Sequence, residues 1–162
     1  MLYDEEMMID DLEALCKAGL NAEIDAINAE KNDSLVLANI PSDKYVYETL
    51  GESVLNFKDF FVMFGVSNPG GLKEASTGNV IEDVTMYLQV ATFDSGEAQR
   101  ANTIKKLLRY RRALRSLIIK NPDVFRGYAK ASLASLMPTA FEFNRNIIIT
   151  VGVNIQASVT AY

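Results

Sequence analysis

The sequence predicts an α+β protein in which one mostly antiparallel sheet packs with two long helices, in the order α-β-β-α-β-β. Three observations support this fold class. Two stretches have the apolar spacing of helices, two strand-like stretches lie between them, and apolar residues alternate along a final stretch of thirteen residues. The chain has 162 residues, of which 49% are hydrophobic, so it can bury a core without metals or disulfides. We expect residues 1–162 to form a single domain.

The first helix is expected over residues 4–30. Its apolar residues recur at steps of three and four, and acids fill its first turns, where the helix dipole favours negative charge. Gly19 and Asn21 interrupt the pattern, which predicts either one bent helix or two shorter ones. A short apolar segment at residues 35–40 then leads to a turn at residues 41–43.

Two strands are expected in the middle of the chain. Residues 60–66 form a short apolar run typical of a strand buried on both faces, and residues 84–91 alternate as in a strand with one face in a core. Residues 67–79 read SNPGGLKEASTGN, a glycine-rich composition that predicts a long, mobile surface loop. We therefore expect the two strands to form a hairpin with an extended tip.

The second helix is expected to begin at the N-cap candidates of residues 94–97 and to end before Asn121 and Pro122. Residues 125–137 have an ambiguous pattern, and Pro138 is expected to end that segment. Apolar and polar residues alternate again at positions 140–144, which we expect to pair with the final strand across a turn near residues 144–146.

The final strand has the clearest pattern, because every odd position from 147 to 159 is apolar. Thirteen extended residues measure ~43 Å, whereas a domain of this size is about 40 Å across. The strand therefore either bends at Gly152 or projects in part and pairs with another subunit. In the second case the inter-subunit strand consists of Ile147, Ile149, Val151, Val153, Ile155 and Val159.

Charged residues are distributed unevenly along the chain. Residues 100–120 contain eight bases and no acid, so the net charge of −5 divides into +8 for this segment and −13 for the rest. The first thirty residues contain nine acids and a single base, Lys17. One end of the chain is therefore strongly negative and one later segment strongly positive.

The basic helix has three candidate roles, namely contact with an acidic protein surface, a plain solvated face, and contact with nucleic-acid phosphates. We favour a protein contact, for example with the acidic first helix of a neighbouring copy. The acidic remainder of the chain repels a polyanion, and no aromatic stacking platform accompanies the bases. The residues expected at this subunit or partner interface are Lys105, Arg109, Arg112, Arg115, Asp10, Asp11 and Glu13.

Little in the sequence points to catalysis. Histidine, the commonest general base and metal ligand, is absent, and Cys16 lies on the apolar side of the first helix, where we expect a buried structural thiol. Gly65 and Gly70 have the spacing that opens a phosphate loop, but Gly71 stands where that motif requires lysine. The acid pair at residues 10–11 is expected on the solvated surface, because adjacent side chains diverge on a helix. We expect no enzymatic activity, no cofactor and no metal.

The acidic N-terminus lacks the basic and apolar regions of a secretory signal. No window approaches the ~18 to 20 apolar residues that a membrane-spanning helix needs. We therefore expect a soluble protein of a reducing cytoplasm with no membrane contact.

The element order, the acidic opening helix, the basic helix after the central hairpin and the closing strand together resemble the tail terminator, or tail completion, proteins of tailed bacteriophages. More loosely, they resemble other head-to-tail joining proteins. The resemblance covers most of the chain and rests on pattern, without a diagnostic motif. Residues 125–138 have no counterpart in that pattern.

The resemblance implies a structural virion protein that forms a ring, expected to be a hexamer, which caps the phage tail tube and then meets the neck or connector proteins of the head. Such a protein is assembled in the host cytoplasm and resides in the tail and neck of the virion, without catalytic residues or cofactors. The loop expected to contact a partner is Ser67, Asn68, Pro69, Gly70, Gly71, Leu72 and Lys73.

The alternative is a small nucleic-acid-binding or regulatory protein that grips phosphates with residues 100–120. Under the assembly hypothesis, charge reversal at Arg109 and Arg112 is expected to block self-assembly and to leave the fold intact, because both side chains are expected on the outer face of the helix.

Overall fold

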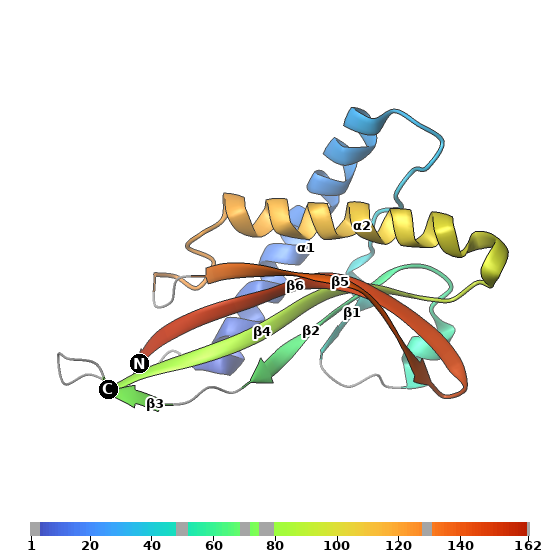
Figure 1. Ribbon diagram of the computed structural model, residues 1–162. Helices are drawn as coiled ribbons and strands as arrows, with labels where there is room; N and C mark the ends of the chain where they lie inside the picture. The colour runs from blue at the N-terminus through green and yellow to red at the C-terminus, as the bar shows by residue number, and fades with distance from the viewer. Residues whose placement is uncertain (1–3, 48–51, 69–71, 75–79, 128–130, 162) are drawn as a thin grey trace.

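The structure is a computed structural model that describes residues 4–47, 52–68, 72–74, 80–127 and 131–161. Within these residues two long helices pack on one face of a twisted sheet, so the predicted α+β class is confirmed (Figure 1). The elements in chain order are α1 (Glu5–Lys31), the 3₁₀ turn η1 (Ser42–Lys44), β1 (Tyr45–Tyr47), the 3₁₀ turn η2 (Glu52–Asn56), β2 (Phe61–Asn68), β3 (Leu72–Glu74), β4 (Val80–Phe93), α2 (Glu97–Lys120), β5 (Ala131–Phe143) and β6 (Asn146–Ala161).

The described strands form one mixed sheet in the order β1-β2-β4-β6-β5, and β3 pairs with the far end of β4. Only β1 and β2 run parallel, and the four long strands pair antiparallel as expected. The strand count exceeds the prediction because β1 and β3 are only three residues long, too short for an alternating pattern to be visible.

The expected loop at residues 67–79 is partly wrong. Ser67 and Asn68 end β2, and Leu72 and Lys73 belong to β3, because β4 starts four residues earlier than its alternating pattern and offers a pairing edge there. The remaining loop positions, Pro69, Gly70 and Gly71 together with residues 75–79, lie outside the described residues.

Helix α1 is one continuous helix through Gly19 and Asn21, so of the two predicted alternatives the pair of shorter helices is wrong. It begins at Asp4, whose carboxylate accepts a hydrogen bond from the Met7 amide at 3.0 Å. A Cβ atom at Gly19 would lie 2.7 Å from a methyl carbon of Leu117 on α2. The glycine therefore serves the close approach of the two helices and does not mark a break.

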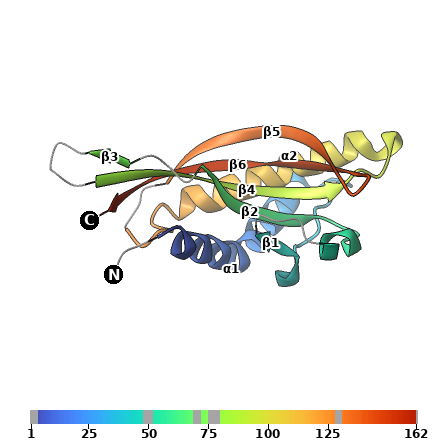
Figure 2. The ribbon, with the colours of Figure 1, turned by 90° about the horizontal axis from the view of Figure 1, so that it is seen from below.

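The main core lies between the helices and the sheet. Alternate residues of β2, β4 and β6 face the helices, with α2 packed on β4, β6 and β5, and α1 packed on β2 (Figures 1 and 2). Cys16 is buried in this core, as expected, and burial followed by the nearby charge of Glu13 raises the pKa of its thiol to about 12. A smaller cluster lies on the opposite face, formed by Val54, Phe61, Met63, Ala91 and Ile148.

Strands β5 and β6 form the predicted hairpin. Phe143 pairs with Asn146, and the two turn residues, Asn144 and Arg145, have φ values of 46° and 63°, which are typical of a two-residue type I′ turn. The expectation that Pro138 ends a segment is wrong. The pairing register shifts between Leu136 and Thr139, and this irregularity accommodates the proline in an edge strand that continues back to residue 131.

Strand β6 lies inside the sheet, which corrects its expected role as an inter-subunit strand. It pairs with β4 over residues 148–161 and with β5 over residues 146–157. Four of the six residues expected to join a neighbour, Ile149, Val151, Val153 and Ile155, are buried in the core of their own chain. Ile147 is 48% exposed, and the side chain of Val159 lies outside the described side chains.

The far end of the sheet nevertheless projects past both helices, as expected for a strand as long as the domain is wide (Figure 2). That end consists of β3, the first residues of β4 and the last residues of β6. Among the described residues, 158–161 pair only with β4, since the described pairing of β5 with β6 ends at residue 157. The register shift lies beside Gly152, where the bend was expected, but it occurs in β5.

Residues 33–40, which we call the strap, run in extended form along α1. The side chain of Asn28 donates to the carbonyl of Leu37 at 2.9 Å and accepts from its amide at 2.8 Å, and Asn21 holds Ile40 by the same two bonds at 3.1 and 2.8 Å. Asn21 and Asn28 are seven residues apart, a rise of ~10.5 Å along a helix. Their partners Ile40 and Leu37 are three residues apart, ~10 Å in an extended chain, so the two spacings match. From α2, Tyr110 donates to the Ala38 carbonyl at 2.7 Å.

Replacement of Asn21 or Asn28 by alanine is expected to lower the free energy of unfolding by about 1–3 kcal/mol each, because an amide and a carbonyl of the strap lose their partner. Asp25→Ala, at an exposed site of the same helix, is the control and should have little effect. Urea denaturation of the three variants checks this. Equal stabilities for all three would contradict the role of the strap.

Gly152→Ala is expected to destabilise the protein by about 1–3 kcal/mol, because a Cβ atom there would clash with the carbonyl oxygen of Leu88 on β4. Asn154→Ala, two residues further along the same strand, serves as the control. Thermal denaturation of both variants measures the difference, and a melting temperature of Gly152→Ala equal to that of the control would contradict the close approach.

Candidate functional site

The basic face of α2 is partly neutralised by acids of α1 and of the strap in the same chain. Arg109 donates to Asp33 at 2.9 Å and to the Leu35 carbonyl at 2.6 Å, and Arg112 pairs with Glu30 at 2.8 Å. Further along, Ser116 and Lys120 both donate to Glu23 at 2.7 Å. The expected match of acidic and basic helices therefore exists, but it forms within one chain.

These contacts shift the pKa values of the acids involved. Hydrogen bonds from Arg109 lower the pKa of Asp33 to about 2, and those from Arg112 lower the pKa of Glu30. The hydrogen bond from Lys120 is the main cause of a lowered pKa at Glu23. All three carboxylates thus remain charged under mildly acidic conditions and keep the helix pair together.

The expectation that Arg109 points outward to a neighbour is therefore wrong, because its side chain is only 16% exposed. Arg112 does lie on the exposed side of the helix, with 50% of its side chain accessible, but it pairs with Glu30 of its own chain. Charge reversal at these two positions removes intramolecular contacts, so it is expected to weaken the fold itself. A loss of assembly in such variants would not identify an interface.

The other expected interface residues divide into two groups. Asp11 pairs with Arg126, and Glu13 with Lys17, so both take part in contacts of their own chain. Lys105, Arg115 and Asp10 are exposed, and none of them forms an ion pair within the described part of the chain. The structure places Asp10 on α1 and the two bases on the outer side of α2.

A groove of about 510 Å³ lies between the first turns of α1 and the β1 side of the sheet. Its apolar lining comes from Ile9, Tyr47 and Phe64, and Tyr47 is 44% exposed. Four acids line the same groove, Glu5, Glu6, Asp10 and Glu13. The groove combines a contact area for an apolar side chain with a rim that attracts cations.

The basic outer face of α2 is formed by Lys105, Arg115 and Ile119, of which Ile119 is 58% exposed. At about 100° per residue these three positions lie within an arc of about 80° on the helix. Sequence reasoning missed Ile119, Tyr47 and Phe64. For Ile119 a signal existed, since it is an apolar residue displaced from the buried stripe that contains Leu114 and Ile118.

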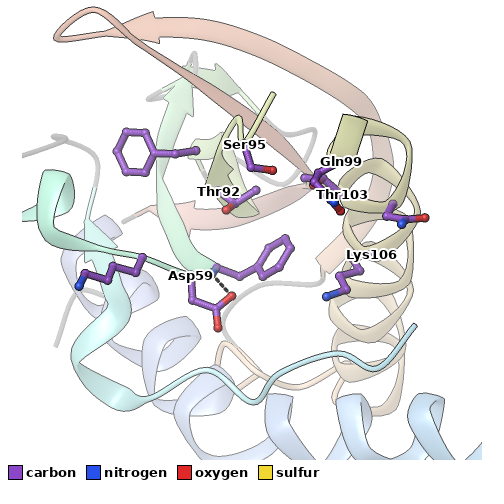
Figure 3. Close-up of a pocket in the computed structure, with 10 residues that line it drawn as sticks. Asp59, Thr92, Ser95, Gln99, Thr103 and Lys106 are labelled. Carbon is purple, nitrogen blue, oxygen red and sulfur yellow. Dashed lines mark hydrogen bonds between the residues drawn. The ribbon is translucent and has the colours of Figure 1, made fainter. Parts of the chain in front are cut away.

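A second, more polar pocket of about 240 Å³ lies where β4 leads into α2. Figure 3 shows Thr92 and Ser95 on the sheet side, Asp59 on the segment before β2, and Gln99, Thr103 and Lys106 along the helix. The Asp59 carboxylate accepts a hydrogen bond from the Phe60 amide at 2.8 Å. The charged residues of the lining are two lysines, Lys58 and Lys106, and one carboxylate, Asp59, which leaves a single net positive charge.

The long edge of the sheet is β5, which pairs only with β6 among the described strands. At the opposite edge, β1 has three residues in the described part of the chain. Edge strands present unpaired amide and carbonyl groups, and natural proteins protect or occupy them. Pro138 and the adjacent register shift divide the β5 edge into two straight segments, residues 131–136 and 139–143.

Among the described residues no three Asp, Glu or Cys side chains converge as metal ligands do. None of the described helices is both long and apolar enough to cross a membrane. The sequence matches no protein-family model and no curated protein. The interpretation of function therefore depends on the surfaces described above.

Asp33→Asn is expected to destabilise the protein in a pH-dependent way. Because the folded-state pKa of Asp33 is depressed to about 2, its contribution is complete above its ordinary pKa of ~3.8 and is lost as the pH falls through about 2. Denaturant titrations of wild type and variant at pH 6, 4, 3 and 2 check this. A stability difference that stays constant over this range would contradict the ion pair.

Proposed function

We propose that this protein is a structural subunit that assembles with copies of itself into a ring. By its resemblance to tail terminator proteins, the ring closes a phage tail tube and joins it to the neck proteins of the head. In this proposal the protein acts by shape and contact in the virion tail and catalyses no reaction. Assembly takes place in the host cytoplasm.

The observation that supports the proposal is the thirteen-residue edge strand β5, beside a sheet whose far end runs past the helices. An unpaired edge of this length is a template for pairing with another chain. A homo-oligomer that occupies the edge removes this hazard, and it gives the projecting end of the sheet a neighbour to contact.

The nucleic-acid alternative has less support. Arg109, Arg112 and Lys120 already bind carboxylates of α1 or the strap. A phosphate that approached these bases would meet Asp33, Glu30 and Glu23 at the same surface, and the like charges repel. The basic segment thus offers far fewer uncommitted cations than its sequence indicates.

The purified protein is expected to form a closed oligomer, measurable by native mass spectrometry and visible as rings in negative-stain micrographs. The mass gives the number of subunits, for which the resemblance implies six. Tail tubes should gain a cap at one end when they are mixed with the protein. A protein that remains monomeric alone and in the presence of tail tubes would overturn the proposal.

A pair of proline substitutions tests whether the β5 edge takes part in assembly. N–H groups of consecutive strand residues point to opposite sides, so in Ala140→Pro and Phe141→Pro one proline removes a donor toward β6 and the other a donor at the open edge. The variant that loses the donor toward β6 should have a lower melting temperature. The variant that loses the donor at the open edge should keep its melting temperature and lose the oligomer.

If the proline variant that keeps its melting temperature also assembles like the wild type, the β5 edge is not an assembly surface. Gln156→Pro, inside the sheet where both sides are paired, is the control for loss of fold and should be the least stable of the three variants.

A further inference from the structure

The acidic groove and the basic outer face of α2 lie on opposite sides of the molecule. Helix α1 packs on β2, at the side of the sheet that ends in β1, whereas α2 packs on β4, β6 and β5 (Figure 2). The groove lies at the β1 side of the sheet, and the basic face lies on the side covered by α2. Within the described part of the chain no ion pair joins the residues of the two surfaces.

The two surfaces are complementary in charge. The groove carries four acids, and within the described residues only Glu13 of these has an ion pair with a base, Lys17. The basic face carries Lys105 and Arg115, both exposed and unpaired in the part of the chain that the structure describes. Opposite charges on surfaces that meet steer association and fix its register.

The two surfaces are also complementary in apolar area and length. Ile119 exposes 58% of its surface beside the bases, and the groove offers Ile9, Tyr47 and Phe64 as an apolar floor. Glu5 and Glu13 lie ~12 Å apart along α1, and Lys105 and Arg115 lie ~15 Å apart along α2. The acidic groove therefore matches the basic outer face of α2 in length, and its apolar floor can accommodate the exposed side chain of Ile119.

We propose that the basic outer face of α2 in one copy docks into the acidic groove of the next copy. This inference rests on the proposed function and names the contact by which the ring forms. Because the two surfaces differ, the interface is heterologous, and repetition of a heterologous contact produces a ring when the rotation closes. An interface between two identical patches would stop at a dimer.

A charge-swap series tests the contact. The groove variant is Glu6→Lys with Asp10→Lys, and the face variant is Lys105→Glu with Arg115→Glu. Each variant alone brings like charges together and is expected to shift the oligomer to monomer in native mass spectra at low salt. All four positions are exposed, and none forms an ion pair within the described residues, so melting temperatures should stay close to the wild-type value.

Two recombinations of the variants are decisive. The fourfold variant restores opposite charges at every contact and is expected to reassemble. An equal mixture of the groove variant and the face variant should form oligomers that contain the two in a 1:1 ratio. When the two variants alternate, the unaltered basic face meets the unaltered acidic groove, and the altered acidic face meets the altered basic groove, whereas a contact between two copies of the same variant repels. Asp25→Lys and Lys58→Glu, exposed positions outside both surfaces, are the matched controls and should assemble normally.

The outcomes separate the two proposals. If the wild type assembles and both one-sided variants assemble equally well, the contact proposed here is overturned while the ring function stands. The contact is likewise overturned if the one-sided variants dissociate but neither the fourfold variant nor the mixture recovers. A wild type that stays monomeric, with or without tail tubes, overturns the ring function and this contact with it.

Discussion

The position of the strap between the two helices is the constraint on which the rest of the structure depends. Helix α1 contacts only one of the described strands extensively, so its orientation is set by α2 and by main-chain groups of residues 33–40. Asn21 and Asn28 hold the strap from one helix, and Arg109 and Tyr110 hold it from the other. The acidic groove exists because α1 is held at this angle to the sheet.

The helix pair also explains the uneven charge of the sequence. As the residue number rises along α2 from Arg109 to Lys120, the number of the acidic partner falls from Asp33 to Glu23, so the two segments pair in opposite chain directions. Separate acidic and basic segments are thus a consequence of intramolecular pairing between elements that lie far apart in the sequence. Only the bases turned away from α1 are left for other partners.

The elements whose pattern repeats over many residues could be predicted. Both helices, β2, β4, the β5–β6 turn and the alternation of β6 follow from apolar spacing. Three features could not be predicted because tertiary contacts override local preference. Gly19 is explained by Leu117 on another helix, Pro138 by its place in an edge strand, and β3 by the reach of β4.

The candidate site was predicted only in part, for a related reason. A sequence shows how many bases share a helix face, but not which of them meet an acid from elsewhere in the chain. Arg109 and Arg115 look equivalent in the sequence, and the structure separates them by what lies opposite each side chain. The apolar members of the groove come from three different elements and leave no local pattern.

The strap is held through its main chain, and this has a consequence for how the sequence can vary. Val36 is 57% exposed, and Ala38 and Asn39 are exposed as well, while their neighbours Leu37 and Ile40 are buried. Because the anchoring groups are amides and carbonyls that nearly every residue type possesses, the outward positions are free to diverge between related proteins without loss of the fold. In contrast, no other side chain of the same length as Asn21 and Asn28 offers both a donor and an acceptor. We therefore expect relatives that share the strap to retain both asparagines.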